Sequence, residues 1–232
     1  IHLNRETNNG VKYDPARDLV ALYAAGTGSG SFYREVARTA DCAPEDVVAG
    51  DLVLYNNQPG TVWGPEGEFV SAPRLDDLAC VFACTEGFLT AQERDMVPVL
   101  CVFDNEEIGS ETKQGAASVF LPETLAAISE ALGLSAADHR ALLADSMMLS
   151  CDNGHARHPN HPELADTNEA PVPNGGVVVK HPPRYATDGV SAAVFTELCR
   201  RTEVPVQHYA NRPDQMGGAT LGNIADTKLP IP

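Results

Sequence analysis

Three short acidic stretches contain residue types that could bind a divalent metal ion. Asp76 and Asp77 lie in SAPRLDDLACVF, Glu106 and Glu107 lie in FDNEEIGS, and Asp152 lies in LSCDNGHARHPN. Each stretch also has a purely structural explanation, because aspartates cap helices and hold turns, and glutamates occur in solvated loops. If the three segments meet at one edge, their carboxylates would provide the oxygen ligands of one or two divalent ions, with histidines expected as the remaining ligands.

The two consecutive glutamates have the arrangement that metal-assisted hydrolysis requires. Glu106 and Glu107 follow an apolar run, VPVLCVF, and neighbouring side chains at the end of a strand point in different directions. One glutamate can bind a metal ion, which lowers the pKa of a water molecule, while the other takes the proton of that water. The pair could therefore generate a nucleophile from a metal-bound water at neutral pH.

Apolar runs alternate with helical patterns in the second part of the chain. Buried strands are expected at residues 97–103, 146–151, 176–180 and 204–210, and helices at 78–92, 116–121, 121–133 and 189–202. Such alternation predicts an α/β domain built around a mostly parallel sheet. In an open sheet of this kind, ligands bind at the carboxyl ends of the strands, and the three acidic stretches lie at such ends or at the start of a helix.

The first part of the chain has a different pattern. It contains the glycine-rich stretch GTGSGS, a helix candidate at residues 31–40 and strand-like pieces at 51–56 and 67–73. We therefore predict a separate β-rich or mixed domain at residues 1–72, followed by the α/β domain at 73–232.

Composition restricts the partners of the chain. With 16 Lys and Arg against 32 Asp and Glu, the formal net charge is −16, and such a charge repels nucleic acid backbones and anionic membranes. The six cysteines contain no CxxC pair, which favours free thiols in a reducing compartment. No apolar run approaches the length of a membrane span, and the residues after Ile1 do not have the basic and apolar pattern expected of a leader. These features predict a cytoplasmic protein without a nucleic acid or membrane partner.

Five stretches together resemble a known family. SAPRLDDL, FDNEEIGSETKQGA, SCDNGHARHPN, VVVKHPPRYATDGVS and QMGGATLG, in this order and at these separations, are similar to the aspartyl aminopeptidase family of co-catalytic zinc metallopeptidases. The resemblance extends over nearly the whole chain. It implies a three-layer αβα metallopeptidase core with a mostly parallel sheet, part of a β-rich dimerisation domain at residues 1–72, two zinc ions per active site, and dimers that assemble into a larger homo-oligomer.

The resemblance also implies roles for the acidic residues. The metal-bridging aspartate of the family corresponds to Asp76, its general base to Glu106, and two further metal ligands to Glu107 and Asp152. The family usually has an uncharged amide where this chain has Asp77. The extra negative charge would raise the pKa of neighbouring carboxyl groups unless a metal ion or an arginine offsets it.

Three further residues resemble family positions that contact the substrate. His2 corresponds to a histidine of the dimerisation domain that reaches the active site of a neighbouring subunit, and a surface histidine is the alternative interpretation. Lys180 and Tyr185 correspond to substrate contacts, and the lysine would suit an acidic P1 side chain through a charge-assisted hydrogen bond. Lys180 could equally be a solvated residue that ends a strand.

The histidine ligands of the family have no counterpart in this sequence. The first would lie before Ile1 and the second beyond Pro232, so we expect the intact protein to be longer. His155 and His158 follow Asp152 closely, but the resemblance favours a role in anchoring their loop or lining the substrate rim over metal ligation.

The resulting hypothesis is a zinc-dependent aminopeptidase that removes an N-terminal residue, Asp or Glu, from peptides. Two alternatives remain open. The chain could be a catalytically incompetent fragment or assembly module of the same fold, or it could belong to a metallopeptidase of broader specificity.

Overall fold

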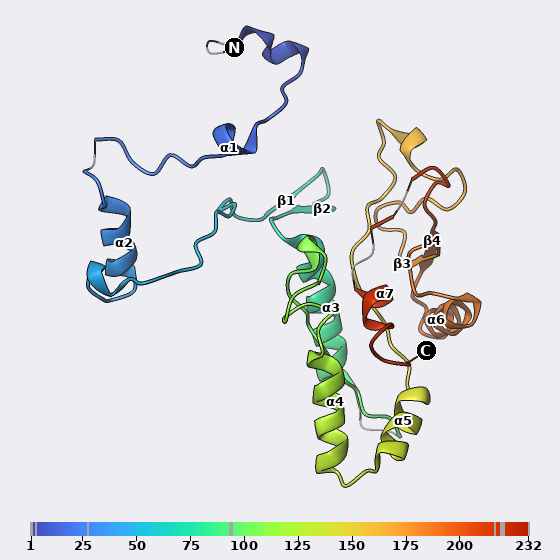
Figure 1. Ribbon diagram of the computed structural model, residues 1–232. Helices are drawn as coiled ribbons and strands as arrows, with labels where there is room; N and C mark the ends of the chain where they lie inside the picture. The colour runs from blue at the N-terminus through green and yellow to red at the C-terminus, as the bar shows by residue number, and fades with distance from the viewer. Residues whose placement is uncertain are drawn as a thin grey trace. The chain divides into compact units, whose positions relative to one another are not determined.

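The computed structural model of the chain describes residues 2, 4–26, 28–92, 95–215, 217–218 and 221–231. These residues form two compact units, Ile1–Asn57 and Gln58–Pro232, whose elements follow one another along the chain as Figure 1 shows. The division between the units falls in the sequence before the predicted domain boundary at residues 72–73, which stays a prediction.

The N-terminal unit is formed by short helices. They are η1 (Arg5–Asn9), α1 (Pro15–Asp18), α2 (Ser31–Thr39) and η2 (Pro44–Asp46). Helix α2 confirms the helix expected at residues 31–40, and its Ala37 is buried. The strand expected at 51–56 is not formed, and three of its apolar side chains, Leu52, Val53 and Leu54, are exposed.

The second unit begins with an antiparallel hairpin. Strands β1 (Thr61–Trp63) and β2 (Phe69–Ser71) pair with Thr61 opposite Ser71. The Trp63 ring stacks on the Phe69 ring with their centroids 4.6 Å apart, and Trp63 Nε1 donates a hydrogen bond of 2.8 Å to Ser71 Oγ. Cross-strand aromatic pairs of this kind stabilise short hairpins. Strand β2 lies within the strand-like piece expected at residues 67–73.

Helix α3 (Leu75–Thr90) carries two of the acidic residues at its start. Asp76 and Asp77 have non-helical backbone angles and are joined by a cis peptide bond. The regular part of the helix therefore begins at Leu78, which confirms the helix expected at residues 78–92. This irregular start directs both aspartates away from the ordinary helical positions.

The remaining helices include one that the sequence did not predict. Helix α4 (Phe120–Ala131) confirms the helix expected at 121–133, whereas α5 (Ala136–Ala144) was not expected. Three further helices are short: η3 (Glu106–Ile108), η4 (Pro162–Leu164) and α7 (Gly222–Ala225). The separate helix expected at 116–121 is wrong, because residues 115–118 form a tight turn in which Ser118 N donates to Gly115 O.

A parallel pair of strands lies at the centre of the C-terminal region (Figure 1). Strands β3 (Val177–Lys180) and β4 (Val206–Tyr209) confirm the strands expected at 176–180 and 204–210, and helix α6 (Gly189–Arg201) connects them. This βαβ unit buries Val179 and Cys199. Because Lys180 is paired with Tyr209, the carboxyl ends of both strands present their side chains to the same place.

Two other expected strands are wrong as regular elements. Residues 97–103 and 146–151 are not strands, and no described segment pairs with them. A strand is stable only when its backbone groups have hydrogen-bond partners on a neighbouring strand. Several apolar side chains of these segments are consequently exposed, including Val97, Val99 and Leu149.

The thiols and the helix lengths can be compared with the expectations from composition. All six cysteines are described, and each is a free thiol. None of the helices formed by the described residues is both long and apolar enough for a membrane crossing.

Candidate active site

A cavity of about 680 Å³ in the second unit is lined by most of the residues singled out in the sequence. Asp76 lies at the start of α3, Glu106 and Glu107 lie in η3, Asp152 lies in the segment after α5, and Lys180 ends β3. A volume of this size is in the usual range for small-molecule sites. The cavity is therefore large enough to hold the end of a peptide.

The other residues singled out in the sequence lie in different surroundings. Tyr185 lines the cavity, and its ring centroid is 5.6 Å from Lys180 Nζ. His155 lines the cavity. The His158 ring lies against the His161 ring instead, with the two ring centroids 5.2 Å apart. His2 is exposed in the N-terminal unit, and its role in a neighbouring active site stays a prediction.

Three carboxylates come close enough to share a metal ion. Asp76, Asp77 and Asp152 each offer an oxygen, and these oxygens all lie within 4.8 Å of one another. The resemblance implied Glu107 as the third ligand beside Asp76 and Asp152. Among the described residues, the third carboxylate of this group is that of Asp77, while Glu107 lines the cavity. Carboxylate oxygens are accepted ligands of zinc and other divalent ions, so the donors fit such an ion.

The electrostatics of this group favour a bound cation. Burial raises the pKa of Asp76, and the negative charges of four neighbouring carboxylates raise it further. Burial also raises the pKa of Asp77, although the neighbouring Cys80 thiol, the hydrogen bond from the Asn153 N–H and the positive charge of Lys180 act in the opposite direction. Carboxylates that disfavour one another's ionised form are stabilised when a positive charge lies between them.

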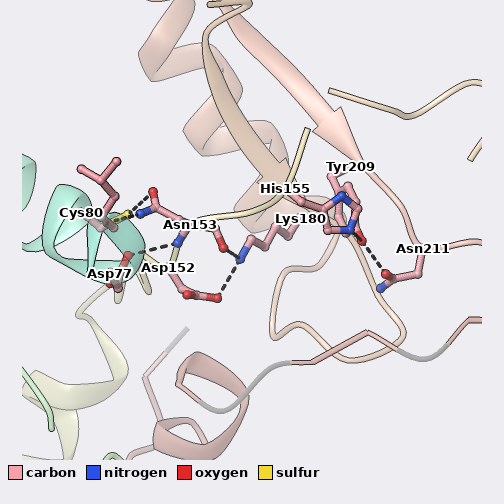
Figure 2. A network of polar contacts seen from close by, with 9 residues as sticks. Asp77, Cys80, Asp152, Asn153, His155, Lys180, Tyr209 and Asn211 are labelled. Atoms are coloured by element: carbon pink, nitrogen blue, oxygen red, sulfur yellow. Dashed lines mark hydrogen bonds and ion pairs between the residues drawn. The ribbon is translucent and has the colours of Figure 1, made fainter. Parts of the chain in front are cut away.

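Asn153 connects the start of α3 to the segment that carries Asp152 (Figure 2). Its backbone N–H donates to Asp77 Oδ1 at 3.1 Å, and its side-chain Nδ2 donates to Leu75 O at 2.7 Å. The Cys80 thiol donates to Asn153 Oδ1 at 3.2 Å. Sequence reasoning missed this residue, although an amide directly after a proposed metal ligand is a signal that could have pointed to it.

Lys180 is the cation next to this group. Its Nζ donates to Asp152 Oδ2 and to Asn153 O, both at 2.8 Å (Figure 2). Only 16% of the Lys180 side chain and 24% of the Asp152 side chain are exposed. The interpretation of Lys180 as a solvated residue at a strand end is therefore wrong.

A second group of polar side chains forms another part of the cavity wall. The Tyr209 hydroxyl donates to Asn211 Oδ1 at 2.6 Å and lies 3.3 Å from His155 Nε2. Burial raises the pKa of Tyr209. Sequence reasoning did not select Tyr209 or Asn211, although both lie at the carboxyl end of a predicted strand, where ligands bind.

Comparison with protein families gives a match over the whole chain. The family described as aminopeptidase I zinc metalloprotease (M18) matches residues 1–232. A probable M18 family aminopeptidase 2 from Clostridium novyi is 37% identical over 239 residues, which cover 100% of this chain and 55% of the relative. The chain thus spans about half the length of the curated relatives that it matches.

Solved structures show the same fold. The structure of the S. cerevisiae mApe1 dodecamer has a TM-score of 0.74 and 32% identity, with 86% of this chain and 46% of that chain covered. A cryo-EM structure of the Ape4 and Nbr1 complex has a TM-score of 0.84 and 25% identity, with 100% of this chain and 49% of that chain covered. The expected metallopeptidase fold is thereby confirmed.

Proposed function

Because this chain belongs to the aminopeptidase I (M18) family of zinc metalloproteases, we propose that the protein removes the N-terminal residue of peptides, with Asp or Glu as the preferred residue. The observation that carries this proposal is the single cavity lined by Asp76, Glu106, Glu107, Asp152 and Lys180. It combines a group of oxygen ligands, a candidate base and a fixed cation within reach of one bound peptide end.

The carboxylates would hold the metal. Asp76, Glu107 and Asp152 are the proposed ligands, with two zinc ions in each site, and Asp77 adds a fourth oxygen donor beside them. Zinc bound here would supply a Lewis acid that polarises the scissile carbonyl and lowers the pKa of a water molecule.

Glu106 is the proposed general base. It lines the cavity in η3, half-buried, next to Glu107. Its carboxylate would take the proton from the attacking water and then pass this proton to the nitrogen of the leaving amine. The proton ends on the amine product, so the base is regenerated after each turnover.

Lys180 and Tyr185 would recognise an acidic side chain of the substrate. The Lys180 ammonium group has three N–H donors, of which two are engaged by Asp152 and Asn153. The third N–H could therefore bond to a substrate carboxylate, which would favour Asp and Glu at P1. A substrate with an apolar P1 side chain would leave this donor without a partner.

We also propose that the protein forms dimers that assemble into a larger homo-oligomer, with His2 reaching the active site of a neighbouring subunit. The relative solved as a dodecamer supports self-association. A cytoplasmic location is proposed from the free thiols.

Replacing Glu106 with Gln tests the mechanism. The substitution keeps the shape of the side chain but removes its ability to accept a proton, so we expect kcat for an Asp-peptide to fall by about 10²- to 10⁴-fold. Glu111→Gln is the matched control, because Glu111 is exposed in the adjoining loop and does not line the cavity. Equal kcat values for Glu106→Gln and the wild type would exclude Glu106 as the base.

A further inference from the structure

We infer that Lys180 is a positioning residue for metal binding, because its ammonium group fixes the orientation in which Asp152 meets a divalent ion. This inference rests on the proposed function, since it assigns a second role at the same site to a residue first considered as a substrate contact. The role does not depend on whether a peptide is bound.

The hydrogen bonds of Lys180 restrain two consecutive residues. Nζ lies 2.8 Å from Asp152 Oδ2 and 2.8 Å from Asn153 O. The bond engages one carboxylate oxygen of Asp152, so the other oxygen remains available as a metal ligand. The same contacts restrain the rotation of the carboxylate about its side-chain bonds.

Lys180 is itself held in a fixed position. Its side chain is 16% exposed and its Nζ lies 5.6 Å from the centroid of the Tyr185 ring, a distance at which a cation is attracted to an aromatic face. A Cβ atom on Gly154 would lie 3.3 Å from Lys180 Cε, so the absence of a side chain at this residue leaves room for the lysine. The cation is therefore in place before a metal ion binds.

A positive charge beside a metal site has two opposing effects. It repels the metal ion, and it also offsets negative charge within the carboxylate group, because Lys180 Nζ lies 2.8 Å from Asp152 Oδ2 and Asp152 lies beside Asp76 and Asp77. Because Asp76, Asp77 and Asp152 all carry negative charge within one group, removal of Lys180 would leave an uncompensated cluster with a mobile Asp152. Loss of an outer partner that orients a metal ligand typically weakens metal binding by about 10- to 100-fold.

The zinc dissociation constant of Lys180→Met, measured without peptide, tests this inference. Competition with a chromophoric zinc chelator gives the constant for the purified protein. We expect zinc binding about 10- to 100-fold weaker than in the wild type, whereas Lys180→Arg, which retains the charge and the donors, should recover most of the affinity. Lys228→Met is the control, because Lys228 is exposed and does not line the cavity.

The outcomes distinguish the two roles of Lys180. If it contacts only the substrate, Lys180→Met will change KM for Asp-peptides and leave the zinc dissociation constant unchanged, which would overturn this inference alone. Tighter zinc binding in Lys180→Met would also overturn it, because the repulsion between Lys180 and the zinc ion would then outweigh any benefit from orienting Asp152. A wild-type protein that fails to bind zinc would overturn the proposed function and this inference with it.

A second variant keeps the test valid if Lys180→Met does not fold. Gly154→Ala retains the charge but places a methyl group 3.3 Å from Lys180 Cε, so the lysine side chain has to shift by a few tenths of an ångström and its contact with Asp152 is disturbed. Gly154 does not have the positive φ that would strain an alanine. We expect weaker zinc binding in this variant with an unchanged circular dichroism spectrum, and an unaltered dissociation constant would contradict the positioning role.

Discussion

Replacement of Asn153 with Ala would disconnect the start of α3 from the segment that carries Asp152. The substitution removes two contacts, the 2.7 Å bond from Asn153 Nδ2 to Leu75 O and the 3.2 Å bond from the Cys80 thiol to Asn153 Oδ1. It leaves the backbone bonds of Asn153 to Asp77 and Lys180 in place. The perturbation therefore affects the side-chain connection alone.

The expected magnitude follows from these two bonds. A neutral hydrogen bond contributes about 0.5 to 1.5 kcal/mol to the free energy of unfolding, and a thiol donor is weaker than an amide donor. We therefore expect Asn153→Ala to lower the free energy of unfolding by about 1 to 2 kcal/mol. Asn153→Asp should be more destabilising, because a carboxylate oxygen would replace the amide donor to Leu75 O and would add a negative charge to the residue whose N–H binds the Asp77 carboxylate.

Urea unfolding followed by far-UV circular dichroism measures this effect. Asn168→Ala is the control, because Asn168 is exposed and its side chain has no hydrogen bond among those found for the described residues. The expected order of stability is wild type, then Asn153→Ala, then Asn153→Asp. If Asn153→Ala and Asn168→Ala have equal free energies of unfolding, the connection through this side chain does not stabilise the fold.

Two further predictions concern glycines and an exposed ion pair. Gly115→Ala should destabilise the protein, because the new Cβ would overlap the backbone carbonyl of Ser110. Gly87→Ala should stabilise it by about 0.5 to 1 kcal/mol, because Gly87 lies within helix α3 and its Cβ would enter open space. Thermal unfolding of both variants provides the measurement, and shifts of the same sign would contradict the reasoning. Hydrogen bonds from two arginines on α6 lower the pKa of Glu197 from 4.5 to about 2. Its stabilising contribution is therefore complete above pH 4.5 and is lost as the pH falls toward 2. The difference in Tm between wild type and Glu197→Gln should narrow over that range, and a difference independent of pH would refute the assignment.

Local sequence signals were sufficient for the elements that have strong periodicity and clear caps. Helix α6 was predicted almost to its ends, because its apolar residues recur at helical spacing and arginines occupy its last turn. In the structure, Asp188 also caps its start by accepting a hydrogen bond from Ser191 N. Strands β3 and β4 were predicted because short β-branched runs flank that helix. Helix α5 was missed, although Ser135 and Asp138 form a capping box that marks its start.

Local sequence signals could not predict which strands pair or which side chains come together in the site. The run at residues 97–103 has the composition of a strand, but strand formation depends on a partner from elsewhere in the chain. In the site, Asp152 and Lys180 are 28 residues apart, and their ion pair results from the position of β3. The grouping of Asp77 with Asp76 and Asp152 depends on the irregular start of α3, for which the sequence has no periodic signal.

The stacked hairpin determines what intrinsic fluorescence can report about this chain. Trp63 is the only tryptophan in the sequence, and it lies on β1 against Phe69, with its indole N–H bonded to Ser71. The emission spectrum is therefore a local probe of the hairpin, and the carboxylate cavity contains no indole of this chain. A thermal transition seen by fluorescence would measure the opening of the β1–β2 hairpin, whereas circular dichroism would follow the helices. The difference between the two transition midpoints would therefore measure how independently the hairpin melts.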